Sequence, residues 1–165
     1  MQSHWFWWAS WDGPTSITGD TLAADQVTVR LAEKSDHDRV LELVKRLDHV
    51  FTVDPSKFSD TFDFVLGDAD RTLVHVAELD GDVIGYCLTT VSPLLYSNGP
   101  SAQLQEIVVD EDKRVSGVGT ALVRVVEQAC VERGVTQLTV ASRRAGGFYD
   151  RLGYSQQAEY MRRLF

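Results

Sequence analysis

Cysteine is scarce in this sequence, and its scarcity excludes several classes of protein. Only Cys87 and Cys130 occur among the 165 residues, each in an apolar stretch and neither in a Cys-x-x-Cys pair. A disulfide scaffold or a zinc ribbon needs more cysteines at closer spacing. We therefore expect two buried free thiols in a reducing, cytoplasmic setting, with a disulfide or a catalytic thiol as the weaker alternatives.

The sequence also has few potential metal ligands, no long apolar run and fewer basic than acidic residues. The four histidines are scattered without ligand spacing, so no metal site is expected. No apolar run approaches the about 20 residues of a membrane span. The 24 acidic residues outnumber the 16 basic ones and give a net charge of −8. This charge disfavours nucleic acid and mildly favours a cationic small molecule or a basic peptide, although solubility alone is the more common reason for such a charge.

What the chain does have is an unusual beginning. All four tryptophans lie within the first 11 residues, and no Lys or Arg precedes them as it would in a signal peptide. We divide the chain into an aromatic-rich extension, residues 1–26, and one domain, residues 27–165. The extension is a segment without function, an arm that docks on the domain or on a second copy to make a homodimer, or a cover over the acceptor site.

Hydrophobic periodicity within the domain predicts alternating strands and helices. An Asp-Gly turn at Asp80-Gly81 indicates a hairpin, and a later strand–helix–strand crossover indicates a parallel pair. The pattern predicts an α/β (α+β) fold with a mixed, mostly antiparallel central sheet of six to seven strands flanked by helices. The expected strands are 27–31, 73–79, 83–91, 103–109, 135–140 and one or two within 154–165; the expected helices are 36–49, 55–66, 117–133 and a short one near 148–152.

A glycine-rich loop between the strand 103–109 and the next helix is the strongest chemical signal. Gly117 and Gly119 remove Cβ atoms where the helix begins, so a phosphate can approach its N–H groups, and Arg114 adds a positive charge. A tight surface turn is the structural alternative. A Walker loop would need lysine after Gly119, and a dinucleotide loop would need a third small residue where Leu122 stands.

Two motifs together resemble the GCN5-related N-acetyltransferase (GNAT) superfamily. Arg114-x-x-Gly117-x-Gly119 is similar to that family's Gln/Arg-x-x-Gly-x-Gly/Ala motif, and it follows an apolar strand end as it does there. The segment from Phe148 to Tyr154 is similar to the family's Phe-Tyr-x-x-Leu-Gly-Phe/Tyr. The sequence departs from the common pattern at Val115, where many members have glycine, and at Ser142, where many have asparagine.

The resemblance implies a GNAT-like acyl-CoA N-acyltransferase fold with acetyl-CoA as co-substrate. The cofactor would lie in an opening between strands 103–109 and 135–140, and the pantetheine amides would pair with the first of these strands as an added strand does. The implied cofactor-binding residues are Ile107, Val108 and Val109 on the strand, Arg114, Val115, Ser116, Gly117, Val118, Gly119 and Thr120 in the loop, and Ser142 and Tyr149 beyond it.

Two residues are candidates for proton transfer. The resemblance implies that Tyr149 protonates the leaving sulfur, although Phe-Tyr pairs also fill cores. Glu106 is the candidate base, acting through water, because a carboxylate in a mostly apolar strand requires a reason. It alternates with Leu104 and Val108, which predicts that it shares a face with Val108. A structural hydrogen bond is the alternative for Glu106.

The implied function is an N-acetyltransferase that moves an acetyl group from acetyl-CoA to a primary amine of a small molecule or peptide by direct transfer. The alternative is a non-catalytic acyl-CoA-binding sensor or docking module, and a third is a nucleotide-binding fold that imitates the loop. Acidic side chains in the variable regions could attract a cationic acceptor: Asp54, Asp60, Asp63 and Glu159.

Overall fold

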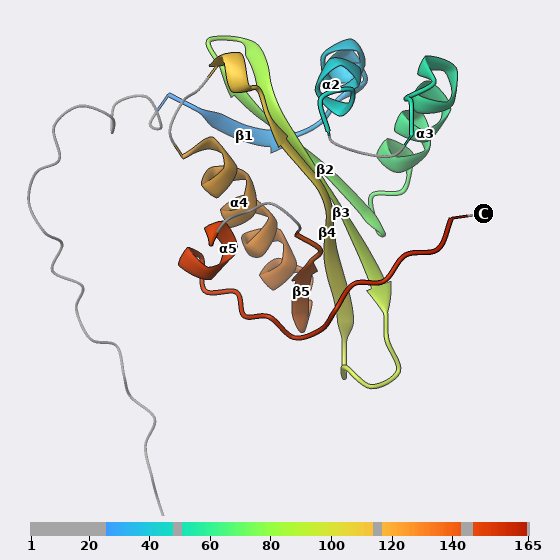
Figure 1. Cartoon of the computed structure of the whole chain (residues 1–165), viewed down its shortest axis with the longest axis vertical. Helices are drawn as coiled ribbons and strands as arrows, with labels where there is room; N and C mark the ends of the chain where they lie inside the picture. Colours follow the sequence, from blue (N-terminus) through green and yellow to red (C-terminus); the bar gives the residue numbers. More distant parts are fainter. Residues whose placement is uncertain (1–25, 48–50, 114–116, 143–146, 165) are drawn as a thin grey trace, which may run out of the picture.

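The computed structural model describes residues 26–47, 51–113, 117–142 and 147–164, which form a mixed sheet with helices on both faces (Figure 1). The strands run in the order β1-β2-β3-β4-β5; the first four are antiparallel neighbours, and β5 is parallel to β4. Their bounds are β1 Thr28–Leu31, β2 Thr72–Leu79, β3 Asp82–Pro93, β4 Pro100–Val109 and β5 Gln137–Val140. The α/β class, the hairpin and the crossover are confirmed.

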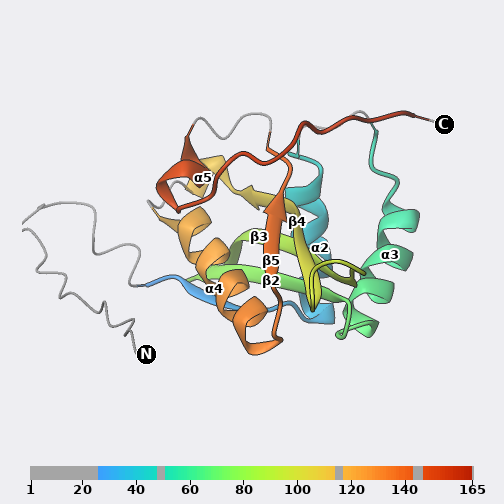
Figure 2. The same cartoon turned by 90° about the horizontal axis from the view of Figure 1, so that it is seen from below.

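The predicted count of six to seven strands is wrong for the described residues, which form five. Residues 154–164 form no strand. This tail runs past β5 and β4 without joining the sheet (Figures 1 and 2). Its first half, Ser155-Gln156-Gln157-Ala158-Glu159, has no alternating apolar side chains to bury, so pairing with β5 would gain little hydrophobic stabilisation.

Helices α2 and α3 cover one face of the sheet, and α4 and α5 cover the other (Figure 2). Asp54 begins α3 by accepting hydrogen bonds from the N–H groups of Ser56 and Lys57, and Gly134 follows α4 with a left-handed φ of 66°. The bounds are α2 His37–Val44, α3 Pro55–Gly67, α4 Val118–Glu132 and α5 Phe148–Arg151, with short 3₁₀ turns at Lys34–Asp36 (η1) and Glu111–Lys113 (η2).

Helix α2 is shorter than the sequence predicts. The expected helix 36–49 begins at His37 and ends at Val44. Its last turn tightens, because Arg46 N–H bonds to the Leu43 carbonyl and Leu47 N–H to the Val44 carbonyl, three residues back rather than four. The periodicity of the sequence continues through this turn, so it could not reveal where the helix stops.

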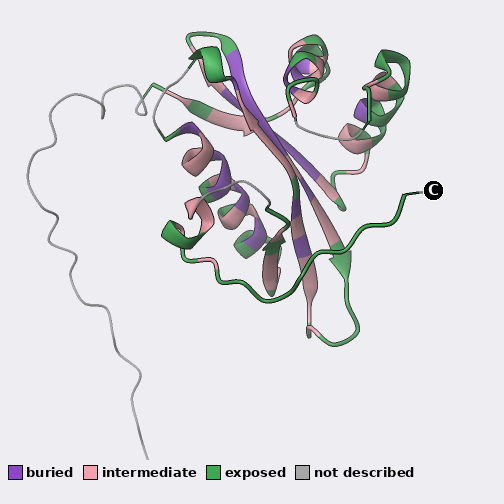
Figure 3. Cartoon of the chain, viewed as in Figure 1, coloured by how far each residue is buried: buried purple, intermediate pink, exposed green. Residues whose placement is uncertain are grey.

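Two apolar clusters, one on each face, hold the layers together. The first lies between the sheet and α4, where Leu122 and Val126 are fully buried and Cys87 and Cys130 contribute buried free thiols. The second lies between the sheet and α2 and α3, around Leu43. The buried positions concentrate along the middle of β2, β3 and α4 (Figure 3). None of the described helices is long and apolar enough to cross a membrane.

A β-bulge in β4 changes which side chains face which cluster. Leu88 of β3 pairs with Glu106, but the next residue, Thr89, pairs with Leu104, so Gln105 is an extra residue. Before the bulge Leu104 faces α4; after it, Ile107 also faces α4, whereas Val108 faces α2 and α3. The alternation of the strand is therefore reversed at Gln105, which the sequence pattern did not predict.

Candidate functional site

The pairing between β4 and β5 stops halfway along β4. The ladder runs from Ser101 opposite Gln137 to Leu104 opposite Val140, where β5 ends. Residues 105–109 of β4 continue without a β5 partner, and their backbone N–H and C=O groups on that side have no ladder bond. Figure 1 shows β5 as a short arrow beside the much longer β4. This open edge contains Ile107, Val108 and Val109, the strand residues expected to bind the cofactor.

The first turn of α4 lies beyond the end of this strand. Gly117 precedes the helix with a left-handed φ of 91°, which favours glycine, and none of the described side chains caps the helix. Its first N–H groups and the positive end of the helix dipole can thus receive an anion. Val118 is buried in the core, and Thr120 is half-buried in the first turn. The predicted loop residues Arg114, Val115 and Ser116 lie outside the described residues.

Gly119 connects the two motifs that lie far apart in the sequence. A Cβ atom placed on Gly119 would lie 3.5 Å from Cζ of Phe148, an ordinary contact distance, so this ring packs directly against the first turn of α4. Gly119 of α4 thus lies beside the Phe148-Tyr149 segment of α5. The close approach of a phosphate to this glycine stays a prediction.

Tyr149 lies on the α4 face of the sheet. Its ring is half-buried and makes edge contacts with Phe148 at 4.9 Å and Tyr154 at 5.5 Å between ring centroids. Burial, and then the nearby Cys87 thiol, raise the pKa of Tyr149 above its ordinary value. Its hydroxyl therefore stays protonated at neutral pH and can act as a proton donor.

Glu106 lies on the opposite face, on the side of α2 and α3. The hydroxyl of the fully buried Tyr86 donates a hydrogen bond to Oε2 of Glu106 at 2.8 Å. Glu106 thus shares a face with Val108, as the alternation predicted, but not with Leu104, because the bulge intervenes. The two proton-transfer candidates border β4 from opposite sides of the sheet.

The remaining candidates take less central places. Ser142 is exposed two residues after β5 ends. Burial raises the pKa of Cys87 to about 12, so its thiol is un-ionised at neutral pH and is a poor nucleophile. Asp63 pairs with Lys34 at 3.1 Å, while Asp60 and Glu159 are exposed. No cluster of three potential metal ligands occurs within the described ranges.

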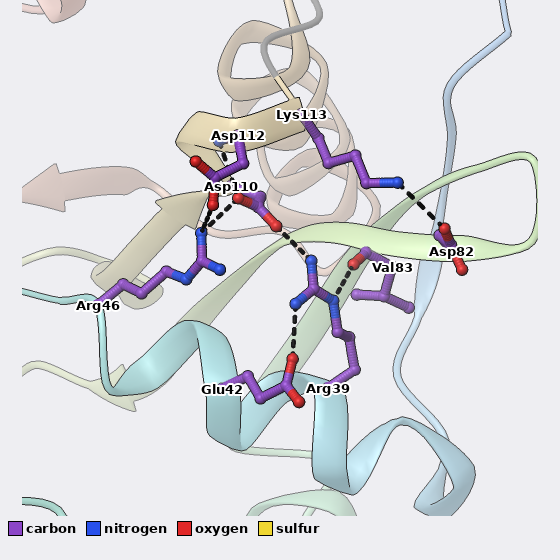
Figure 4. A network of polar contacts seen from close by, with 8 residues as sticks. All are labelled: Arg39, Glu42, Arg46, Asp82, Val83, Asp110, Asp112 and Lys113. Carbon is purple, nitrogen blue, oxygen red and sulfur yellow. Dashed lines mark hydrogen bonds and ion pairs between the residues drawn. The ribbon is translucent and has the colours of Figure 1, made fainter.

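Sequence reasoning missed a buried carboxylate at the end of β4. The side chain of Asp110 is 3% exposed and pairs with Arg39 of α2 and with Arg46 in the turn after α2 (Figure 4). Burial alone would raise the pKa of Asp110, but the Arg39 and Asp112 hydrogen bonds and the two arginine charges outweigh it and lower the pKa. The apolar triplet before Asp110 indicated the end of a strand. The ion pairs of Asp110 could not be predicted, because its partners lie 64 and 71 residues away in the sequence.

Comparisons with known proteins concern the family and the fold of the chain. Residues 38–154 match the profile described as the acetyltransferase (GNAT) family. A transcriptional regulator from Bacillus halodurans C-125 has a similar structure, with a TM-score of 0.75 and 20% identity over 84% of this chain and 99% of that chain. Glucosamine-6-phosphate N-acetyltransferase from Arabidopsis thaliana gives 0.75 and 21% over 84% and 98%.

A third similar structure is ribosomal-protein-alanine N-acetyltransferase from Brucella melitensis biovar Abortus 2308. Its TM-score is 0.65, at 19% identity over 84% of this chain and 99% of that chain. At these identities the structures show a shared fold and no more. No curated protein matches the sequence significantly.

Proposed function

Because the chain belongs to the acetyltransferase (GNAT) family, we propose that it moves an acetyl group from acetyl-CoA to a primary amine of a small molecule or peptide by direct transfer. The observation that carries the proposal is the open edge of β4 over residues 105–109, close in sequence to the start of α4, which no described side chain caps. The strand edge suits the pantetheine amides, and the helix start suits the pyrophosphate. Bound acetyl-CoA would supply the activated acyl group at this edge.

The transfer requires two proton movements around one exchange of bonds. The amine nitrogen attacks the thioester carbonyl, a C–N bond forms, the C–S bond breaks, and CoA leaves as the thiol. In this proposal Glu106 accepts the amine proton through water, and Tyr149 donates a proton to the sulfur. A backbone N–H at the open edge of β4 stabilises the carbonyl oxygen by about 3 kcal/mol.

The environments of the two residues support this division of roles. The pKa of Tyr149 is raised and not lowered, so its hydroxyl carries a proton at neutral pH, as a proton donor must. Glu106 is half-buried, and the donated hydrogen bond from Tyr86 fixes one carboxylate oxygen and leaves the other free to accept a proton. Because the two residues lie on opposite faces of the sheet, Glu106 can accept the amine proton from one side while Tyr149 donates a proton to the sulfur from the other.

Thiol release with a panel of amines tests the proposed activity. The protein is incubated with acetyl-CoA and an amino sugar, an alkyl diamine, an aminoglycoside or a peptide with a free N-terminus, and free CoA thiol is followed. We expect release with at least one amine. Tyr149→Phe and Glu106→Gln should each lower kcat about 100-fold, the lower end of the usual contribution of acid–base groups.

The outcome also separates the proposal from the non-catalytic alternative. Binding of acetyl-CoA without thiol release for any amine would favour an acyl-CoA sensor. No binding of acetyl-CoA at all would remove the basis for both functions. Full activity of Tyr149→Phe would leave Tyr149 with a packing role only.

A further inference from the structure

Asp110 occupies the point at which the chain leaves the sheet for the loop before α4. Its N–H donates to the Ile84 carbonyl at 2.8 Å, as though β4 continued for one more residue. Its own carbonyl accepts a hydrogen bond from Lys113 N–H at 3.2 Å, and its Oδ1 accepts from Asp112 N–H at 3.0 Å. One residue thus fixes both the end of β4 and the whole turn η2, and Arg114 follows directly after that turn.

Two arginines from the opposite layer hold this carboxylate. Nη2 of Arg39 donates to Oδ2 of Asp110, and Nη1 of Arg46 donates to Oδ1 (Figure 4). The same Arg46 nitrogen reaches Oδ2 of Asp112 at 3.0 Å, so it joins the residue before η2 to the middle residue of that turn. Arg39 is itself fixed, because its Nε donates to the Val83 carbonyl at 2.8 Å and its Nη1 to Glu42 at 2.7 Å.

The burial of this group indicates that it does more than add stability. The Asp110 side chain is 3% exposed, whereas those of Arg39 and Arg46 are 27% and 41% exposed. Taking a carboxylate out of water offsets much of what its ion pairs gain, so such a group is a weak source of stability. Asp110 instead fixes the local geometry. Both of its carboxylate oxygens and its backbone N–H and C=O groups are bonded to partners in β3, in η2, in α2 or in the turn after α2.

We propose that Asp110, held by Arg39 and Arg46, is a positioning residue. It holds the chain that leaves β4 in the conformation that binds the CoA pyrophosphate. The inference rests on the proposed function. The clamp lies between the open edge of β4 and the start of α4, the two places assigned to the pantetheine and the pyrophosphate. Because η2 is the described segment between β4 and α4, a shift of η2 would disturb how these two places lie relative to each other, and a small misplacement of binding groups is costly.

Calorimetric titration with CoA tests the clamp in the full chain. Asp110→Asn keeps the shape and removes the charge, and Arg46→Gln removes the more exposed of the two arginines. We expect each to raise the Kd for CoA roughly three- to thirtyfold, the usual range for a residue that acts through others. Arg46→Lys, which keeps a charge able to reach Asp110, should restore part of the affinity.

Asp36 offers a matched control. It is also a buried aspartate, bound by Arg30 through two hydrogen bonds of 2.8 and 2.9 Å, but it lies at the N-terminal end of α2 beside β1. Asp36→Asn should lower the thermal midpoint as Asp110→Asn does, yet leave the Kd for CoA within about twofold of the wild type, because its partners, Arg30 and Glu33, belong to neither β4 nor η2. If CoA binding were weakened equally in Asp36→Asn and Asp110→Asn, Asp110 would contribute only to the general stability of the fold.

A second comparison isolates the phosphate groups. S-acetyl-pantetheine carries the same thioester but no pyrophosphate, so Asp110→Asn should lower kcat/KM with acetyl-CoA much more than with S-acetyl-pantetheine. If the wild type binds CoA and both Asp110→Asn and Arg46→Gln bind it equally well, the positioning role is wrong while the proposed function stands. If the wild type does not bind CoA, the proposed function fails and this inference fails with it.

Discussion

Two buried carboxylates illustrate how single residues organise this molecule. Asp36 lies just before α2 and Asp110 just after β4, and arginines hold each of them. The pKa of Asp36 is lowered chiefly by the hydrogen bond from Arg30, against the opposing effect of burial. Because both pKa values are lower in the folded chain, their contribution to stability is present above about pH 4, the unfolded value, and is lost as the pH falls through the folded values.

A buried histidine makes stability pH-dependent nearer to neutrality. His75 is 4% exposed on β2, and burial, then the charge of Arg133, lower its pKa. Between this lowered pKa and the unfolded value of about 6.5 the unfolded chain binds the extra proton, so stability falls as the pH falls below about 6.5. Urea midpoints at pH 7.5 and 5.5 should show this loss, and His75→Gln should reduce it. An equal loss in His75→Gln would assign the effect to other groups.

At the scale of elements, the contact between α4 and α5 limits the size of the side chain at position 119. Gly119→Ala adds a Cβ at ordinary contact distance from Phe148 and improves helix propensity, so it should leave stability unchanged or raise it. Gly119→Val adds two methyl groups against the ring and should destabilise the fold by about 1–3 kcal/mol. It should also weaken CoA binding.

Urea unfolding and CoA titration of the two Gly119 variants check this expectation. The alanine variant is the control for loss of glycine itself. If the valine variant is as stable as the alanine variant and binds CoA as tightly, the proximity of Phe148 has no energetic consequence.

Most elements could be predicted from the sequence because each has a local pattern. The hairpin at Asp80-Gly81, helix α3 with its Asp54 cap and helix α4 with its glycine ends all follow from neighbouring residues. The bulge at Gln105 and the missing terminal strands could not be predicted, because both depend on pairing with distant segments. The clamp at Asp110 shares this limit, since its partners lie in another layer.

At the scale of the whole molecule, one sheet is shared by two cores. Leu43 belongs to the core under α2 and α3, and Leu122 to the core under α4; both are 0% exposed. Either residue changed to alanine should cost about 2–5 kcal/mol of the free energy of unfolding. Since both cores pack on the same strands, the domain should still unfold in one transition.

Urea unfolding followed by circular dichroism tests this coupling. Leu43→Ala and Leu122→Ala should lower the midpoint and keep the dependence of the free energy on urea concentration unchanged. A second transition in only one of the variants would mean that one face of the sheet can lose its helices independently.

The bulge also sets a rule for how this chain can change in length. The two halves of β4 are out of phase by one residue, and Gln105 supplies the offset. Deleting Gln105 would remove the extra residue and leave Leu104 and Glu106 adjacent, opposite Thr89 and Leu88, so Ile107 and Val109 would still face α4. Replacing Gln105 by another residue should also be mild, because its side chain is exposed. The chain can therefore lose or change a residue at this position, whereas one residue more or less elsewhere in β4 would disturb the pairing of the side chains that follow.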